Sequence, residues 1–243
     1  ETLNFGWGFF FALCLTRQGL VNYNKPMSSR KVPLTNGEYY HVFNRGVDKR
    51  LIFSNKEHLY YFFKSLSLLN TTDQSSGQSL TRKSLVSNNN VELVSIVAYA
   101  LLPNHFHLLL KQEVDDGITK FMQKLGTSYT MFFNKQEKRS GALFQGKFKS
   151  NHLSGEFALP IVSAYINLNY KHHQIDLAKQ LVKTSLFEYF DEELGDRICS
   201  KNELDAIVIE SGGLTDYKNM IKQASMSFAD NKGVALSFDD FEF

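Results

Sequence analysis

The chain has 243 residues, of which 43% are hydrophobic and 21% charged, and its formal net charge at pH 7 is +2. This balance is ordinary for a globular protein with one sizeable core, and it excludes a disordered or strongly basic chain. Cys14 and Cys199 are the only cysteines, which excludes a disulfide framework and a Cys-x-x-Cys zinc site. A cytoplasmic location is expected.

The N-terminal part of the chain is unusual. Residues 5–15, FGWGFFFALCL, form an apolar run that is too short to span a bilayer. No basic segment precedes this run and no clear cleavage site follows it, so a signal peptide is not expected. Met27 opens MSSRKVPL as a natural start would. We expect residues 1–36 to be an N-terminal extension outside the fold; the alternative is a small helix packed on the domain.

Residues 38–45, EYYHVFNR, are rich in aromatic and β-branched side chains and predict a strand that Gly46 closes. His41 is interpreted as a half-buried strand residue rather than a member of a functional site. Cations cluster at the end of this strand, where they could meet phosphates or simply be solvated: Arg45, Lys49 and Arg50.

The next segment predicts an amphipathic helix that ends near residue 70. Ser54 is the expected N-cap, and Glu57 three residues later would complete a capping box. Apolar residues recur at helical spacing and predict a core-facing stripe: Leu59, Phe62, Phe63, Leu66 and Leu69. Residues 70–90 are rich in Ser, Thr, Asn and Gln and predict a long polar insertion.

The sequence LLPNHFHLLLK at residues 101–111 carries the most informative motif. Pro103-Asn104 predicts a tight turn between a strand in residues 91–100 and a second strand that begins near His105. Alternate side chains of a strand point to opposite faces, so His105 and His107 would share one face while Phe106 enters the core. Two adjacent imidazoles form a partial metal site. The alternative is a chance His-x-His pair that binds no metal.

A second amphipathic helix is predicted over residues 118–136, after the turn Asp115-Asp116-Gly117. Its apolar residues follow a period of 3.6 and would face the core: Phe121, Leu125, Tyr129 and Phe132. Tyr129 is therefore assigned to packing.

Residues 141–153, GALFQGKFKSNHL, alternate after Gly146 and predict an edge strand with a basic face. Lys147 and Lys149 would point one way and Phe148 the other. Basic and aromatic residues together suit a groove for single-stranded nucleic acid, in which cations follow the phosphates and rings stack on bases. The alternative is that the lysines only protect an exposed edge from aggregation.

A third helix is predicted from residue 156 to about residue 173, with Pro160 in its first turns. Tyr165 and Asn169 are four residues apart and share one face of this helix. A helical tyrosine usually belongs to a core or an interface, but beside a metal site it could be a nucleophile. Residues 177–190 are expected to pack against the domain, and the acidic C-terminus to form a tail.

The predicted order is strand, helix, strand, strand, helix, strand, helix. This order indicates an α+β protein with a ferredoxin-like antiparallel sheet and helices on one face.

Four segments together resemble the REP-associated tyrosine transposases. These segments are YYHVFNRGVDKRLIF, AYALLPNHFHLLL, the run from SYTMFFN to GALFQGKFKS, and AYINLN. Such transposases belong to the wider insertion-sequence family that carries a His-hydrophobic-His motif (the HUH motif) and one catalytic tyrosine. The resemblance spans residues 37–173 in the correct order. It implies an HUH-type domain that acts on single-stranded DNA, with residues 37–174 as catalytic domain and 175–243 as C-terminal helical extension and tail.

The resemblance also implies roles for individual residues. His105 and His107 would bind a divalent metal, Mg²⁺ or Mn²⁺, Asn169 would be a third ligand, and Tyr165 would be the nucleophile. The chain departs from the family at Tyr170, where relatives usually have proline, and at Leu102, where methionine is common. The first difference concerns the end of the catalytic helix rather than the chemistry.

The expected function is therefore a metal-dependent transposase that cleaves and rejoins single-stranded DNA through a 5′-phosphotyrosine intermediate. Its expected partners are hairpin-forming single-stranded DNA and a second copy of the chain, with no membrane. Two alternatives stay open. One is a DNA-hairpin-binding protein that has lost catalysis, and the other is a replication-initiator or relaxase-type nickase.

Overall fold

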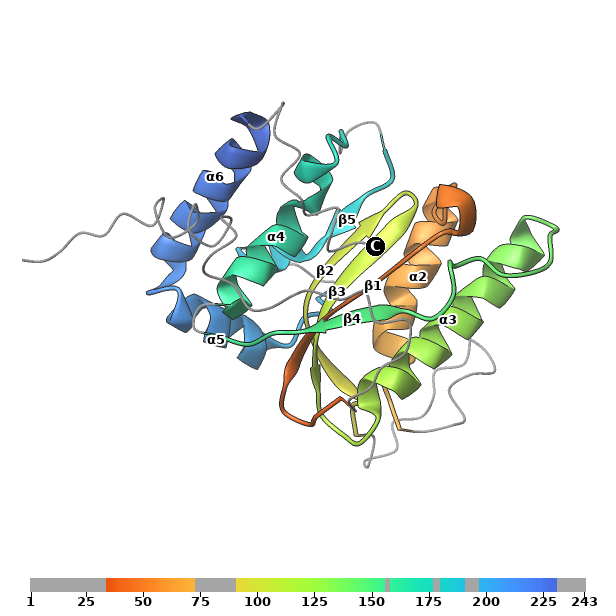
Figure 1. The fold of residues 1–243 in the computed structure, drawn as a ribbon, viewed down its shortest axis with the longest axis horizontal. Helices are drawn as coiled ribbons and strands as arrows, with labels where there is room; N and C mark the ends of the chain where they lie inside the picture. Colours follow the sequence, from red (N-terminus) through yellow and green to blue (C-terminus); the bar gives the residue numbers. More distant parts are fainter. Residues whose placement is uncertain (1–33, 73–90, 156–157, 177–179, 191–196, 231–243) are drawn as a thin grey trace, which may run out of the picture.

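The computed structural model describes residues 34–72, 91–155, 158–176, 180–190 and 197–230 (Figure 1). The predicted extension, up to residue 33, and most of the predicted polar insertion, residues 73–90, lie outside this part. The first half of the fold consists of β1 (Tyr39–Arg45), η1 (Val47–Lys49), α2 (Lys56–Leu68), β2 (Val94–Leu102), β3 (His105–Gln112) and α3 (Gly117–Gln136). The second half consists of β4 (Lys149–His152), α4 (Ala158–His172), β5 (Lys183–Thr184), η3 (Ser185–Tyr189), α5 (Lys201–Glu210) and α6 (Leu214–Asp230).

The strands form one antiparallel sheet in the order β4-β1-β3-β2-β5. The order of the first four strands, with α2 and α3 as the two connections, is the arrangement of a ferredoxin-like domain. The predicted α+β class and ferredoxin-like sheet are confirmed. Strand β4 lies at one edge, as the basic alternating segment predicted.

Helices cover both faces of the sheet, whereas the sequence led us to expect them on one. Helices α2 and α3 pack side by side on one face, where Phe62 contacts Phe106 with ring centroids 5.1 Å apart. Helix α4 packs on the opposite face, over β2 and β3, and Figure 1 shows it on the other side of the sheet from α2 and α3. The prediction failed because the apolar stripes of helices do not specify which face of a sheet each one covers.

The two central strands are buried almost completely because both of their faces are covered. Every residue of β2 is buried, which agrees with its mostly apolar sequence VSIVAYALL. Leu102 pairs with His105, so Pro103 and Asn104 form the two-residue turn that the sequence predicted. The backbone oxygen of Pro103 accepts hydrogen bonds from the amides of Ile52 and Phe53. These bonds tie the turn to the chain that leads into α2.

The chain after residue 174 extends the fold. Strand β5 pairs with β2 and becomes the second edge of the sheet, and helix α6 packs against α4. Packing of residues 177–190 was predicted, but an added strand was not. The division at residue 174 stays a prediction. Within the described part of the chain, no helix combines the length and apolar character needed to cross a bilayer.

The N-cap of α2 is Asn55 and not Ser54, as the sequence had suggested. The side-chain oxygen of Asn55 accepts from the backbone amide of His58. The Ser54 hydroxyl instead contacts Nδ1 of His58 at 3.3 Å. Both residues are good N-caps, and the choice depends on which one adopts extended backbone geometry at the first turn.

Replacing Asn55 by Ala should lower the free energy of unfolding by about 1 kcal/mol, because one amide of the first helical turn loses its acceptor. Urea unfolding followed by circular dichroism measures the change. Ser54→Ala is the matched control and should have a smaller effect; a larger effect from Ser54→Ala would contradict the assignment of the cap.

Candidate active site

The alternation of β3 sends its residues into two different layers. Phe106 enters the core beneath α2 and α3, while His105 and His107 point to the face that α4 covers. His105 is 5% exposed and His107 is 1% exposed. The predicted sharing of one face by the two histidines is confirmed as geometry, and both imidazoles are held away from bulk water.

Each of these imidazoles has a specific hydrogen-bond partner at Nδ1. His105 Nδ1 lies 2.6 Å from Oδ1 of Asn104. An amide oxygen only accepts, so His105 Nδ1 donates and Nε2 of the neutral ring carries the lone pair. His107 Nδ1 lies 2.8 Å from Nε2 of His41 on the neighbouring strand β1. Both histidines are thus oriented through Nδ1, an arrangement typical of metal-binding imidazoles.

Tyr165 lies in the middle of α4 and faces the histidine pair. Its ring centroid is 6.2 Å from that of His107 and 6.1 Å from that of His41, and both contacts are edge-on. Tyr165 is 9% exposed, so its side chain is enclosed between the helix and the sheet. The structure therefore brings together the tyrosine and the histidines that the sequence predicted as partners.

Asn169 lies one helical turn after Tyr165 and is fully buried. Neither its Oδ1 nor its Nδ2 makes a hydrogen bond within the part of the chain that the structure describes. One turn further, His173 stacks edge-on against His105 with ring centroids 4.7 Å apart. Asn169 thus lies on α4 between the two points where this helix contacts the histidines of β3. A buried amide without hydrogen bonds costs folding free energy, and this cost suggests a ligand for it.

The predicted DNA-binding cations lie beside this face, on the β1–β4 side. Lys149 pairs with Phe43, which pairs with His107, so Lys149 lies two strands away, at about 10 Å. Arg45 pairs with His105. Lys147 is exposed and follows Gly146, whose carbonyl accepts from the side chain of Asn44.

The loop after β1 carries the other two predicted cations. A Cβ at Gly46 would lie 2.4 Å from the backbone oxygen of Arg50, so only glycine allows the loop to fold back this tightly. Lys49 is exposed at its tip with a left-handed φ of 58°. Arg50 braces the loop itself, because its Nε donates to the carbonyl of Val47. Lys49 is therefore better placed than Arg50 to meet a ligand.

The other tyrosines near the motifs have structural surroundings. The Tyr129 hydroxyl donates to the carbonyl of Ile52 in the core, and burial raises the pKa of this phenol. Tyr99 donates to the buried carboxylate of Glu188 at 2.7 Å. Tyr170 is partly exposed, and burial raises its pKa. Tyr165 alone among these four contacts the histidine pair.

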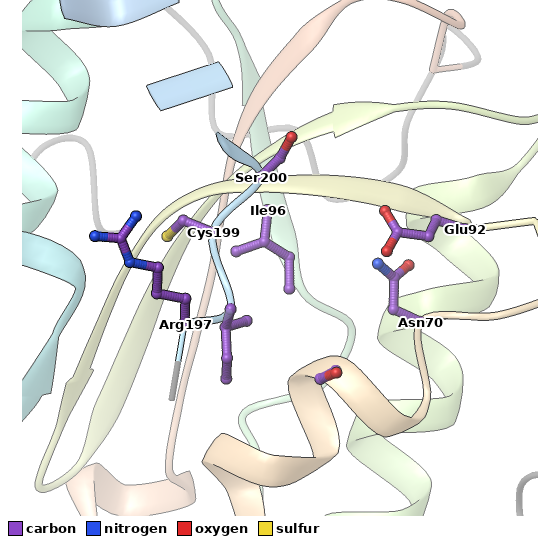
Figure 2. A pocket seen from close by; sticks show the side chains of 8 residues that line it. Asn70, Glu92, Ile96, Arg197, Cys199 and Ser200 are labelled. Carbon is purple, nitrogen blue, oxygen red and sulfur yellow. The ribbon is translucent and has the colours of Figure 1, made fainter. Parts of the chain in front are cut away.

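The site is nearly closed. The hollow beside His105 and His107, which Arg45 also lines, has a volume of about 10 Å³, the space of a single water. A larger cavity of about 270 Å³ lies at the other end of β2, lined by Asn70, Glu92 and Arg197 among others (Figure 2). β2 ends at Leu102, the partner of His105, whereas this cavity borders Ile96. The larger cavity is therefore separate from the histidines.

Sequence reasoning missed the role of three histidines at this site. His41 is buried rather than half-buried, and it contacts both His107 and Tyr165. His172 is the last residue of α4 and His173 follows it, and both reach the site from the end of the helix. The alternation of β1 places His41 and Arg45 on one face, which was the available signal. The register between β1 and β3 was not readable from the pattern.

The side chains at this site determine whether it could hold a divalent metal. Within the described ranges, no three His, Cys, Asp or Glu side chains form a cluster that could hold a metal ion. The set predicted from the sequence has two imidazoles and one amide, and an amide oxygen is an acceptable ligand for Mg²⁺ or Mn²⁺. The lone pair on His105 Nε2 and the unbonded amide of Asn169 fit such a group.

Comparison with known proteins agrees with the motifs. Residues 72–169 match the family described as Transposase IS200 like. The matched segment is similar to this transposase family over part of the chain. It contains β2, β3, α3, β4 and most of α4, and thus His105, His107, Tyr165 and Asn169. The match agrees with the resemblance to transposases that the motifs indicated.

Two further comparisons add little to the family match. No curated protein matches the chain. A solved structure of a REP-associated tyrosine transposase bound to a REP hairpin is similar, with 15% sequence identity and a TM-score of 0.43. The similarity covers 60% of this chain and 74% of that chain.

Replacing Asn169 by Leu should leave the free energy of unfolding of the metal-free protein unchanged or raise it by about 1 kcal/mol, because a buried amide without hydrogen bonds is removed. Asn167→Leu is the matched control on the same helix. It should lower stability by about 1–3 kcal/mol, since Asn167 Oδ1 accepts from Ser185 at 2.6 Å. Denaturant unfolding with EDTA compares the two, and equal destabilisation would show that Asn169 has a structural partner.

Proposed function

We propose that this protein is a transposase that cleaves and rejoins single-stranded DNA, with Tyr165 as nucleophile and a divalent metal at His105, His107 and Asn169. The observation that supports this most is the edge-on contact of the Tyr165 ring with His107 at 6.2 Å, across the interface between α4 and the sheet. A helix-borne phenol and a strand-borne imidazole pair are the minimum that phosphodiester cleavage through tyrosine requires.

The chemistry at Tyr165 is a transesterification. The phenol oxygen forms a bond to phosphorus and the bond from phosphorus to the 3′ oxygen breaks. The products are a 5′-phosphotyrosine and a free 3′ hydroxyl, and the proton lost by the phenol balances the one gained by the departing oxygen. The phosphodiester count is unchanged, so another 3′ hydroxyl can reverse the step without ATP.

The protein must supply what an isolated tyrosine lacks. A phenol with a reference pKa of about 10 is largely protonated at neutral pH and attacks slowly. A bound Mg²⁺ or Mn²⁺ would withdraw charge from the phosphate oxygens. Asn104 and His41 orient the two imidazoles, α4 holds the phenol against them, and the enclosed site excludes bulk water.

The cations beside the histidines suggest where the DNA strand would lie. Lys147 and Lys149 line the β4 edge, and Arg45 ends β1 beside His105. Helix α4 packs over β2 and β3 and leaves the neighbouring β1 and β4 less covered on this face. Phosphates bound along the cations of β1 and β4 would therefore approach His107 from that side. The hollow beside the histidines has room for a single water, so binding of the strand would require side chains around it to move. Recognition of a hairpin and formation of a homodimer stay predictions.

The near closure of the site favours one alternative, a protein that binds DNA hairpins without cleaving them. In such a protein, Tyr165 would only fill the interface between α4 and the sheet. Binding of hairpin DNA with no covalent adduct under any metal condition would establish this alternative.

Incubating the transposase with hairpin-bearing single strands and Mn²⁺ should yield a covalent protein–DNA adduct that survives denaturing electrophoresis. Tyr165→Phe should reduce the adduct by a factor on the order of 10³ or more, because the attacking oxygen is absent. Tyr170→Phe on the same helix is the matched control and should retain it. An undiminished yield from Tyr165→Phe would remove Tyr165 as the nucleophile.

A further inference from the structure

His41 lies on β1, outside the His-hydrophobic-His motif of β3, yet it forms a hydrogen bond with His107 of the proposed metal site. Its Nε2 lies 2.8 Å from Nδ1 of His107, and the two rings stack with centroids 5.1 Å apart and an interplanar angle of 22°. His41 is 7% exposed and packs against Phe43 at 5.0 Å. Both neighbours restrict its ring to one orientation.

The chemistry of this contact depends on tautomers. Two neutral imidazoles can share one hydrogen bond only if one nitrogen carries a proton and the other a lone pair. If His107 Nδ1 donates, then His107 Nε2 has its lone pair available for a metal, and His41 holds its own proton at Nδ1. If His41 Nε2 donates instead, His107 carries its proton at Nε2 and cannot bind a metal there.

We infer that His41 is a positioning residue that accepts the hydrogen bond from His107 Nδ1 and so fixes the tautomer and ring orientation of His107 for metal binding. This inference rests on the proposed function for the metal site, but the tautomer itself can be observed without metal. The same arrangement exists at the neighbouring histidine, where Asn104 Oδ1 can only accept from His105 Nδ1 at 2.6 Å. His41 would thus do for His107 what Asn104 does for His105.

The position of His41 also bears on Tyr165. The edge of the Tyr165 ring contacts His41 at 6.1 Å and His107 at 6.2 Å, so the stacked pair forms the surface against which the phenol packs. Phenylalanine at position 41 would keep an aromatic surface but remove the acceptor nitrogen. Glutamine can place an acceptor oxygen close to where Nε2 lies. These two substitutions separate the hydrogen bond from the packing.

The first test uses protein labelled with ¹⁵N at histidine, held metal-free at a pH where the rings are neutral. Long-range ¹H–¹⁵N spectra report which nitrogen of each ring carries the proton, and His107→Gln identifies the signals of His107. We expect His107 to be protonated at Nδ1 in the wild type and to lose this preference in His41→Phe. A wild-type His107 protonated at Nε2 would overturn the inference, whatever the variants do.

The second test is the affinity for Mn²⁺, measured by calorimetry on variants whose folding is checked by thermal unfolding. His41→Phe should weaken binding by about 10- to 100-fold, the range for loss of an orienting partner, and His41→Gln should recover most of it. His152→Gln, at an exposed histidine bonded to Glu38, is the control and should bind as the wild type does.

The outcomes separate the inference from the function on which it rests. Wild-type affinity in His41→Phe, or a loss in His41→Gln as large as in His41→Phe, would overturn the positioning role. If the wild type binds no Mn²⁺ while His107 is protonated at Nδ1, the proposed metal site fails and the positioning of the ring stands.

Discussion

The whole site depends on the two-residue alternation of one strand. β3 is covered on both faces, so Phe106 must enter one core while His105 and His107 enter the layer beneath α4. Burying two imidazoles is costly unless their polar atoms are satisfied, and Asn104 of the turn and His41 of β1 meet this demand at the two Nδ1 atoms. A shift of one residue in the register would exchange the two faces and destroy both the core and the site.

Helix α4 is the other half of the site, and the chain that follows it holds it in place. Asn167 accepts from Ser185 of η3, and the hydroxyls of Ser163 and Tyr217 lie 3.0 Å apart. The buried Glu188 accepts from Tyr99 on β2 and from the amides of Ile198 and Cys199. Hydrogen bonds from the C-terminal segment therefore tie α4 to α6 and η3, and tie β2 to the chain just before α5. Residues that the sequence left without a clear role set the position of the proposed nucleophile.

Local patterns predicted much of this protein. The turn at Pro103-Asn104, the shared face of His105 and His107, the edge position of the basic strand and the packing role of Tyr129 all follow from periodicity and turn chemistry. The role of His41 did not, because its partner is chosen by the register of β1 against β3, which the pattern of one strand cannot give. The face covered by α4 and the added strand β5 are likewise set by tertiary packing. The choice between Ser54 and Asn55 depends on the backbone geometry of a single residue.

The same tertiary packing places the phenol and the nearby cations on different sides of the histidines. α4 lies over β2 and β3, so Tyr165 points from that half of the sheet towards His41 on β1. On the far side of β1, Lys149 lies in the row of Phe43 and His107, and its face continues to Asn151, opposite His41. Lys183 of β5 turns instead to the other face, where its Nζ lies 4.1 Å from the centroid of the Phe63 ring. Arg45 and Lys149 therefore lie on the face of the histidines, on the side of the sheet away from β2 and β3, over which α4 packs. In the proposed function, a phosphate held by these cations would approach the imidazole pair from the β1–β4 side. Tyr165 would approach the same phosphate from α4.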